Sequence, residues 1–325
     1  MKNKNYKKSA LNSINLQIKA LQKLKSSIGS SFNEAVKTIG ECNSKTILIG
    51  VGKSGHVASQ IASSLSSIGA PSFTLSASDC SHGDLGSMSR KDVLVLISNS
   101  GETAELRPIA SYANRNKITL IGITTKKNSL LYKSSDIKIL IPEVKESGPG
   151  GIVPSSSIIA QASLGSSLVI AVMQFKKHGI MSFKKWHPAG TLSKKLLTVE
   201  DLMIKGKNNV PFVNENLKMK EALKILRKKN LGIIIARNSK KNTTGLLSDG
   251  DVKRIIQKNK NLESIAVKKV MTSNPITINK NVLAIKALLL MQTKNVTSLC
   301  VSSGKSTKKI VGLIRIQNIL ESTIQ

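Results

Sequence analysis

The sequence predicts an α/β protein: a doubly wound, mostly parallel sheet flanked by helices, followed by a tandem pair of small α+β modules. Two observations support this fold class. Short apolar runs rich in β-branched residues alternate with helical patterns over the first half of the chain, as in an open parallel sheet. Residues 213–255 and 278–320 then repeat one pattern, with Asn230 aligned on Asn295. Two copies of this length are typical of a paired module that buries its core between the copies.

The composition narrows the class of protein. With 325 residues, the chain is too long for one small domain, and 40% hydrophobic residues can supply proper cores. A formal net charge of +32 would suit a nucleic-acid-binding protein. However, lysines are spread along the whole chain, and aromatic residues make up only 3%, too few for base stacking. We therefore expect a solvated basic surface that steers anionic metabolites toward the protein, and no nucleic-acid partner.

The cysteines and the hydropathy pattern indicate a cytoplasmic protein. Cys42, Cys80 and Cys300 show no CxxC spacing, as expected of inert thiols in a reducing compartment. The basic N-terminus lacks the apolar core of a signal peptide. No run approaches the roughly 18 apolar residues that span a membrane, so we expect no membrane partner.

The N-terminal part of the chain predicts a helix and then a parallel α/β unit. Residues 1–12 are polar and lysine-rich and are expected to fray. From Ile14 to Ile39, apolar residues recur every three or four positions, which predicts one long amphipathic helix. Thr46–Val51 reads as a buried strand. The glycine-rich turn Gly52–His56 and a helix follow it, but the turn lacks the spacing of a nucleotide P-loop.

The stretch around residue 100 is the strongest candidate site. Val93–Ile97 is a fully apolar run that predicts a buried strand, and a helix is expected to begin at Glu102. Between them, the hydroxyls of Ser98, Ser100 and Thr103 and the unpaired N–H groups of a helix N-terminus would form an anion site. The alternative is an ordinary serine-capped turn.

Other strands extend the predicted sheet. They are expected at 72–75, 119–124 and 137–141. Ligands of open parallel sheets bind beyond the carboxyl ends of the strands, where Lys53, Ser98–Glu105 and Glu143–Glu146 fall. The helix expected at 158–176 is nearly all apolar or small, which predicts deep burial between domains or between subunits.

Several motifs resemble a known family. GVGKSGH, HGDLG, SNSGETAE and the KES–PSSS segment resemble the sugar isomerase (SIS) domain, and the repeats resemble cystathionine-β-synthase-type (CBS) domains. Their combination is similar to the D-arabinose-5-phosphate isomerase family, which supplies the precursor of the lipopolysaccharide sugar Kdo. The resemblance implies an N-terminal helical segment at 1–40, a SIS domain at 41–197 and CBS domains at 203–262 and 270–325. It also implies a homotetramer acting on a sugar phosphate, with no cofactor required.

The resemblance also implies the site residues. Lys53, Glu105, Glu146 and His187 match catalytically relevant positions. The expected substrate-binding residues are Ser54, Gly69, Ala70, His82, Ser98, Ser100, Thr103, Ser155 and Ser156. In the first repeat, Asp249 and Asp251 match the acidic pair of a CBS nucleotide pocket, so a nucleotide or nucleotide sugar is a possible effector. The second repeat has Ile316–Asn318 at that place, which lacks the acidic pair.

The sequence departs from the family pattern at three places. Ser76 stands where relatives commonly carry a histidine associated with metal binding, so no metal site is carried over. Ala189 replaces a glycine of the HPGG motif, and Gly165-Ser166 replaces a glycine–aspartate pair. These changes alter details of the family pattern and leave the predicted class unchanged.

The residues suit aldose–ketose isomerisation through an enediol. A carboxylate can move the proton if burial raises its pKa toward neutrality, and either Glu105 or Glu146 could do so. His187 or His82 could open the sugar ring, and Lys53 could stabilise the developing enediolate. Two alternatives remain: another SIS isomerase, such as a phosphoheptose isomerase, or a sugar-phosphate-binding regulator without catalysis.

Overall fold

A computed structural model describes residues 6–187, 194–206, 208–258, 262–304 and 309–324. The chain divides into two compact units, Met1–His187 and Pro188–Gln325, and each is described by itself.

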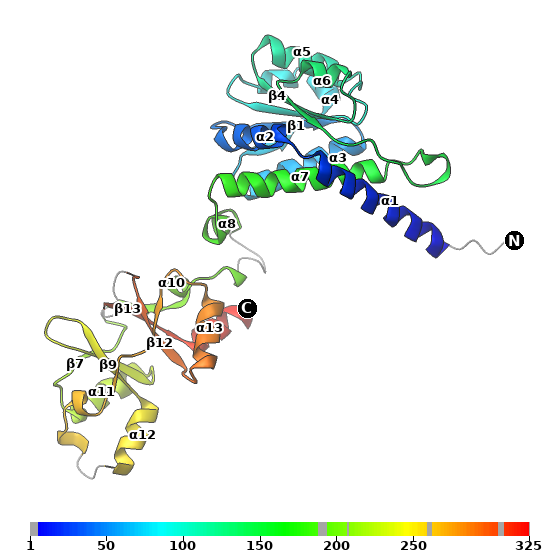
Figure 1. The fold of residues 1–325 in the computed structure, drawn as a ribbon. Coiled ribbons are helices and arrows are strands. Elements are labelled where there is room, and N and C mark those ends of the chain that lie inside the picture. The colour runs from blue at the N-terminus through cyan, green and yellow to red at the C-terminus, as the bar shows by residue number, and fades with distance from the viewer. Residues whose placement is uncertain (1–5, 188–193, 207, 259–261, 305–308, 325) are drawn as a thin grey trace. The chain divides into compact units, whose positions relative to one another are not determined.

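The first unit is built on a five-stranded parallel sheet (Figure 1), in the order β2-β1-β3-β4-β5. The strands are β1 Thr46–Gly50, β2 Ser72–Thr74, β3 Val93–Ile97, β4 Thr119–Thr124 and β5 Ile137–Leu140. The three central strands β1, β3 and β4 are buried over almost their whole length, as their unbroken apolar runs predict. The predicted parallel α/β sheet is therefore confirmed.

Helices cover both faces of this sheet (Figure 1). One core lies under α1, α2, α3 and α7, and the other lies under α4, α5 and α6. The helices are α1 Tyr6–Ser27, α2 Ser30–Glu41, α3 Lys53–Ser67, α4 Ala77–Cys80, α5 Leu106–Arg115, α6 Leu130–Ser134, α7 Ser156–Phe175 and α8 Ile180–Trp186, with short 3-10 turns η1 Asp84–Ser87 and η2 Pro149–Gly151.

The N-terminal helical region differs from the prediction in two ways. Helix α1 already begins at Tyr6, within the segment expected to fray. The single long helix is broken at Gly29, which adopts an extended backbone and precedes α2. The break lets each helix turn its own apolar stripe to the core: Leu24 is buried on α1, and Val36 and Ile39 are buried on α2.

Helix α7 also departs from the sequence expectation. By length and composition it could cross a membrane, although the sequence was expected to contain no such run. In the structure α7 packs against α1, α2 and α3 as a core helix of the first unit. Its burial is one-sided, because Ile170 and Phe175 are 56% and 42% exposed.

The second unit contains the two predicted repeats. The first sheet has the order β10-β9-β8-β7 and the second β11-β12-β13-β6. The elements are α10 Val199–Leu202, β6 Ile204–Lys205, β7 Phe212–Asn214, α11 Met219–Lys229, β8 Ile233–Arg237, β9 Thr243–Ser248, α12 Asp249–Lys258, η3 Leu262–Ser264, η4 Val267–Lys269, β10 Thr272–Ser273, β11 Thr277–Asn279, α13 Ala284–Thr293, β12 Ser298–Ser302, β13 Ile310–Arg315 and α14 Ile316–Ile324.

The two copies share local backbone details at equivalent positions. Asn230 and Asn295, aligned from the sequence, both adopt a left-handed backbone, with φ of 50° and 51°. A bulge interrupts the pairing at equivalent places, after Ala236 and after Val301. Side chains from both copies form a common core, as predicted: Val210, Ile233, Ile235, Cys300, Ile310 and Leu313.

Candidate active site

The first part of the site is the turn between β1 and α3. Gly52 has φ of +58°, and Lys53 begins α3 with its side chain exposed to solvent. A Cβ on Gly50 would lie 2.7 Å from the Ser54 backbone, and one on Gly55 would lie 2.8 Å from the Gly50 oxygen. These glycines let the strand end and the helix start touch, which brings Lys53 and Ser54 directly to the sheet edge.

The second part is the loop that follows β3. The hydroxyls of Ser98 and Thr103 lie 2.8 Å apart, and the Gly101 N–H donates to Ser98 Oγ at 3.0 Å. The Glu102 N–H donates to Ser100 Oγ at 3.2 Å. Because these bonds hold the loop in a closed turn, the helix begins at Leu106, four residues later than predicted.

Glu105 is the last residue of this loop. It lies at the N-cap of α5, its side chain makes no capping hydrogen bond, and it is exposed. Its carboxylate is therefore not engaged in capping its own helix.

The third part is Glu146, which caps α7 from a distance in sequence. Its Oε2 accepts hydrogen bonds from the N–H groups of Ser155 and Ser156, both at 2.7 Å, and from Ser155 Oγ at 3.1 Å. Its Oε1 accepts one from the Ser157 N–H at 3.2 Å. A carboxylate at a helix N-terminus satisfies otherwise unpaired N–H groups and complements the helix dipole.

These bonds determine the charge state of Glu146. Burial alone would raise the pKa of this carboxyl, but the hydrogen bonds from Ser157, Ser155 and Ser156 outweigh burial and lower its pKa. From the sequence, we expect burial to raise the pKa of the catalytic base. In the structure, the pKa of Glu146 is instead lowered. Ser155 and Ser156, expected to bind substrate, use their backbone N–H groups to hold Glu146.

These three segments leave the same edge of the sheet. β1, β3, β4 and β5 are parallel and in register up to their last residues, with Gly50 opposite Ile97 and Thr124 opposite Leu140. The order of the strands reverses between β1 and β3, which is where ligands of such sheets bind. Lys53, Glu105 and Glu146 thus lie in the segments that follow β1, β3 and β5 at one edge of the sheet, as predicted from the sequence.

Sequence reasoning missed Gln161 on α7. This residue is 2% exposed, and its Oε1 accepts a hydrogen bond from Ser54 Oγ at 3.1 Å. Ser54 was expected to bind substrate, and in the structure its hydroxyl donates its hydrogen bond to Gln161. The signal in the sequence was a large polar residue in a helix that is otherwise nearly all apolar or small.

Three expected site residues lie at the other end of α3. Gly69 follows the helix with φ of +79°, and Ala70 is buried beside it. The Trp186 ring occupies the place of a Gly69 Cβ, so α8 packs there, and His187 stacks on Phe183 with 3.9 Å between ring centroids. Since α3 has 15 residues, its ends lie about 20 Å apart. Within one chain, His187, Gly69 and Ala70 are not brought together with Lys53.

The remaining expected residue of this unit, His82, is exposed in the turn between α4 and η1. Ser76, which replaces a metal-associated histidine, caps α4 by accepting from the Asp79 N–H. Ser76 also lines a 370 Å³ cavity beside β1 and β2, together with Gly52 and His56. Among the described residues no cluster of three or more histidine, cysteine or acidic side chains could hold a metal.

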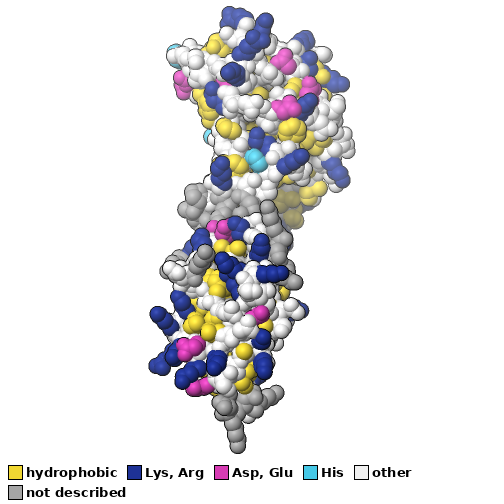
Figure 2. Space-filling view, turned by 90° about the vertical axis from the view of Figure 1, so that its left-hand side faces the viewer, with side chains coloured by type: hydrophobic (Ala, Val, Ile, Leu, Met, Phe, Trp, Pro, Cys, Tyr) yellow, Lys and Arg dark blue, Asp and Glu magenta, His cyan; other side chains and the backbone are white. Residues whose placement is uncertain are grey.

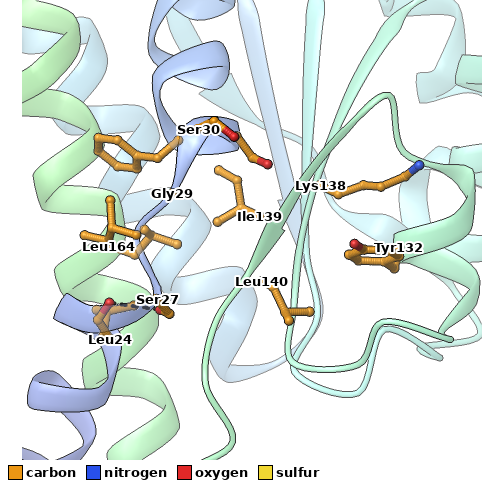
Figure 3. Close-up of a pocket in the computed structure, with 12 residues that line it drawn as sticks. Leu24, Ser27, Gly29, Ser30, Tyr132, Lys138, Ile139, Leu140 and Leu164 are labelled. Atoms are coloured by element: carbon orange, nitrogen blue, oxygen red, sulfur yellow. Dashed lines mark hydrogen bonds between the residues drawn. The ribbon is translucent and has the colours of Figure 1, made fainter.

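A second cavity of this unit lies away from these residues. Figure 3 shows it beside the edge strand β5, between the α1–α2 junction and Leu164 of α7. Its volume is 190 Å³, and Lys138 extends from its wall over the ring of Tyr132. None of the expected site residues lines it.

The second unit has a larger cavity between its two copies. It has a volume of 620 Å³, within the range of small-molecule sites. Asp249, Asp251 and Arg254 line it from the first copy, and Arg315 and Gln317 line it from the second. Both predicted nucleotide-binding aspartates therefore reach one cavity.

Asp251 is already engaged by neighbours at the junction of β9 and α12. Ser248 donates to it through its N–H at 2.9 Å and its hydroxyl at 2.7 Å, and Arg254 pairs with its other oxygen. Burial would raise the pKa of Asp251, but these partners lower it. Asp249, whose carboxylate faces Gly232, is the aspartate less constrained by its neighbours.

The charges on one face of the molecule and two of the buried thiols agree with the sequence expectations. On the face drawn in Figure 2, lysine and arginine side chains are scattered over each unit and interleaved with uncharged surface. Burial, with Asp84 and Asp79 nearby, raises the pKa of Cys80, and burial raises the pKa of Cys300 to about 12. Such thiols are poor nucleophiles, in line with the sequence expectation.

Comparison with known proteins gives the family. The SIS domain model matches residues 40–171, and the CBS domain model matches residues 199–258 and 267–324. Arabinose 5-phosphate isomerase KdsD of Escherichia coli K12 is 30% identical, over 95% of this chain and 93% of that protein. An uncharacterised protein of Rickettsia prowazekii is 35% identical, over 97% of both chains.

Solved structures resemble the first unit. The E. coli CFT073 protein c3406, in complex with arabinose 5-phosphate, is 33% identical with a TM-score of 0.54, and the match covers 58% of this chain and all of that one. A putative sugar-phosphate isomerase of Listeria monocytogenes is 26% identical with a TM-score of 0.56, over the same shares.

Proposed function

Because the chain belongs to the arabinose 5-phosphate isomerase family, with a SIS domain and two CBS domains, we propose that it interconverts D-ribulose 5-phosphate and D-arabinose 5-phosphate. The observation that carries this proposal is the similarity to these isomerases over nearly the whole chain, CBS pair included. The loops at the sheet edge support it, because they offer the ammonium and carboxylate groups that an enediol mechanism needs.

Within this mechanism, Glu105 is the better candidate for the base. The carboxylate of Glu146 already accepts hydrogen bonds from three consecutive N–H groups, and its lowered pKa makes it a weak proton acceptor. Glu105 is free of capping bonds at the same edge. Glu105 would take the proton from the carbon beside the carbonyl and return it to the neighbouring carbon.

Lys53 and the loop Ser98–Thr103 would stabilise the negative charges of the enediolate and of the phosphate. The ammonium of Lys53, at the positive end of α3, can stabilise the enediolate oxygen as charge develops there. The loop Ser98–Thr103 would bind the phosphate through its hydroxyls and N–H groups. Glu146 would act indirectly, by holding the start of α7 in place.

The position of His187 favours a site shared between subunits. His187 lies about one length of α3 from Lys53, so in one chain it cannot reach the same sugar. In a homotetramer, His187 of one subunit can complete the site of another and open the sugar ring. Helix α1 supports self-association, because it exposes an apolar stripe with a spacing of three and four residues: Leu11, Ile14, Ile18 and Leu21.

The pathway and the compartment follow from the same proposal. The product would feed the synthesis of Kdo for lipopolysaccharide, in the cytoplasm, where the phosphorylated pentoses are made. The CBS cavity would take a nucleotide or nucleotide sugar, with Asp249 on the ribose and Arg315 near the phosphates. An effector bound there would make the isomerase activity depend on the nucleotide concentration.

Direct assay tests the proposal. The purified full-length chain should convert D-ribulose 5-phosphate to D-arabinose 5-phosphate, and should exchange the C2 proton of D-arabinose 5-phosphate with solvent deuterium. Turnover of sedoheptulose 7-phosphate instead would indicate a phosphoheptose isomerase. Binding of sugar phosphates without any C2 exchange would indicate a regulator and would refute the proposed activity.

A further inference from the structure

Gln161 is a buried polar group that the mechanism above does not use. It lies on α7 with 2% of its surface exposed. Its Oε1 accepts from Ser54 Oγ at 3.1 Å, and its Nε2 has no hydrogen-bond partner among the described residues. Burying an amide with an unpaired donor destabilises the fold, so an apolar side chain would be less costly if Gln161 only filled space.

Gln161 lies between two parts of the candidate site. On one side it contacts Ser54, the neighbour of Lys53 in the first turn of α3. On the other side, one turn earlier on α7, the Ser157 N–H donates to Glu146 at 3.2 Å. One helical turn of α7 thus connects the lysine and glutamate segments, with the unpaired amide between them.

We propose that Gln161 binds the substrate: its Oε1 holds Ser54 and the first turn of α3, and its Nε2 donates a hydrogen bond to an oxygen of the sugar phosphate. This inference rests on the proposed function and adds a residue to it. An amide suits the task because it offers an acceptor and a donor from one rigid group and stays neutral at every physiological pH.

Two substitutions separate this role from a purely structural one. Gln161→Glu keeps an oxygen that can accept from Ser54 but removes the N–H donor at neutral pH. Gln161→Met keeps the size and removes both functions. If the donor binds substrate, both variants should raise KM for D-ribulose 5-phosphate about tenfold or more, the loss expected for one hydrogen bond to a charged or strongly polar ligand.

The matched controls are Gln174→Glu and Gln174→Met, on an exposed position of the same helix, which should leave KM unchanged. A normal KM in Gln161→Glu would overturn the inference, because the bond to Ser54 would then suffice. So would a normal KM in Gln161→Met. Thermal unfolding of each variant identifies any that fails to fold; if the buried carboxylate of Gln161→Glu prevents folding, a normal KM in Gln161→Met still overturns the inference.

A failure of the proposed function is recognised separately. It appears as absence of turnover in the unmodified chain, before any substitution. In that case calorimetric binding of D-arabinose 5-phosphate to the unmodified chain and to Gln161→Met tests the contact directly. Equal affinities would overturn the inference, and a tenfold weaker variant would support it.

Discussion

The carboxylate of Glu146 accepts a hydrogen bond from the Ser156 N–H at 2.7 Å, ten positions later in the chain, and so caps the N-terminus of α7. This relationship changes the role expected for a glutamate in this segment. A carboxylate whose oxygens are occupied by N–H groups of a helix holds structure in place, and its low pKa makes it a weak base.

Substituting Glu105 and Glu146 with glutamine, one at a time, should distinguish the catalytic base from the residue that caps α7. Glu105→Gln should lower kcat about 10²-fold or more while leaving thermal stability unchanged, because Glu105 makes no capping bond. Glu146→Gln should lower stability by about 1 kcal/mol, the usual value of an N-cap. Kinetics and thermal unfolding of both variants check this. A stable Glu105→Gln with normal kcat would exclude Glu105 as the base.

The stability contributed by Glu146 should depend on pH. Its pKa is lower in the folded than in the unfolded state, so its contribution is complete above the unfolded pKa of about 4.3 and is lost as the pH falls through the folded value. The stability difference between the unmodified chain and Glu146→Gln should therefore be constant near pH 7 and shrink below about pH 4. Urea unfolding at several pH values measures it. Glu143→Gln, at an exposed ion pair with Lys126, is the control and should show little change at any pH.

Mixing two inactive variants tests the proposed site shared between subunits. Lys53→Met and His187→Asn chains should each be inactive alone, since each lacks one group of the site. Refolded or co-expressed together, they should recover part of the activity, because some sites then combine an intact Lys53 with an intact His187 from another chain. A mixture no more active than its components would mean that His187 does not complete a neighbouring site.

Alanine substitution of two glycines in the CBS pair should destabilise the second unit, because a Cβ has no room at either position. A Cβ on Gly245 would meet Met271 Sδ at 2.4 Å and Thr272 O at 2.9 Å, and one on Gly312 would meet Met203 Sδ at 2.7 Å and Ile204 O at 2.8 Å. Each alanine substitution should destabilise the second unit by about 1–3 kcal/mol, the cost of overpacking. Gly250→Ala, whose nearest neighbour lies at 3.6 Å, is the control and should be tolerated in thermal unfolding.

The CBS cavity should bind adenine or cytidine nucleotides. Nucleotide addition should raise the unfolding temperature of the full chain, and Asp249→Asn should abolish the shift. Asp251→Asn should also lower stability without ligand, because Asp251 is bonded to Ser248 and Arg254. No shift with any nucleotide would remove the regulatory role assigned to this cavity.

Local patterns along the chain were enough to predict the strands of the first sheet and the repeat, but not the break at Gly29 or the start of α5 at Leu106. Apolar runs such as Val93–Ile97 mark buried parallel strands, because both faces of such a strand are covered. The alignment of Asn230 with Asn295 predicted that these two residues occupy equivalent positions in the two copies. In the structure both follow a helix and adopt the same left-handed conformation. A single sequence displays such patterns directly, because they depend on residues close to one another in the chain.

The contacts of the site residues, in contrast, depend on the tertiary fold. Gln161 meets Ser54 across 107 positions of the chain, and Trp186 fills the space beside Gly69, which carries His187 to the far end of α3. Such contacts depend on how α7 and α8 pack on α3, and packing is set by the shape of many distant side chains together. For that reason the sequence could name Lys53, Glu146 and His187, but it could not predict that Glu146 is a helix cap or that His187 lies remote from the lysine.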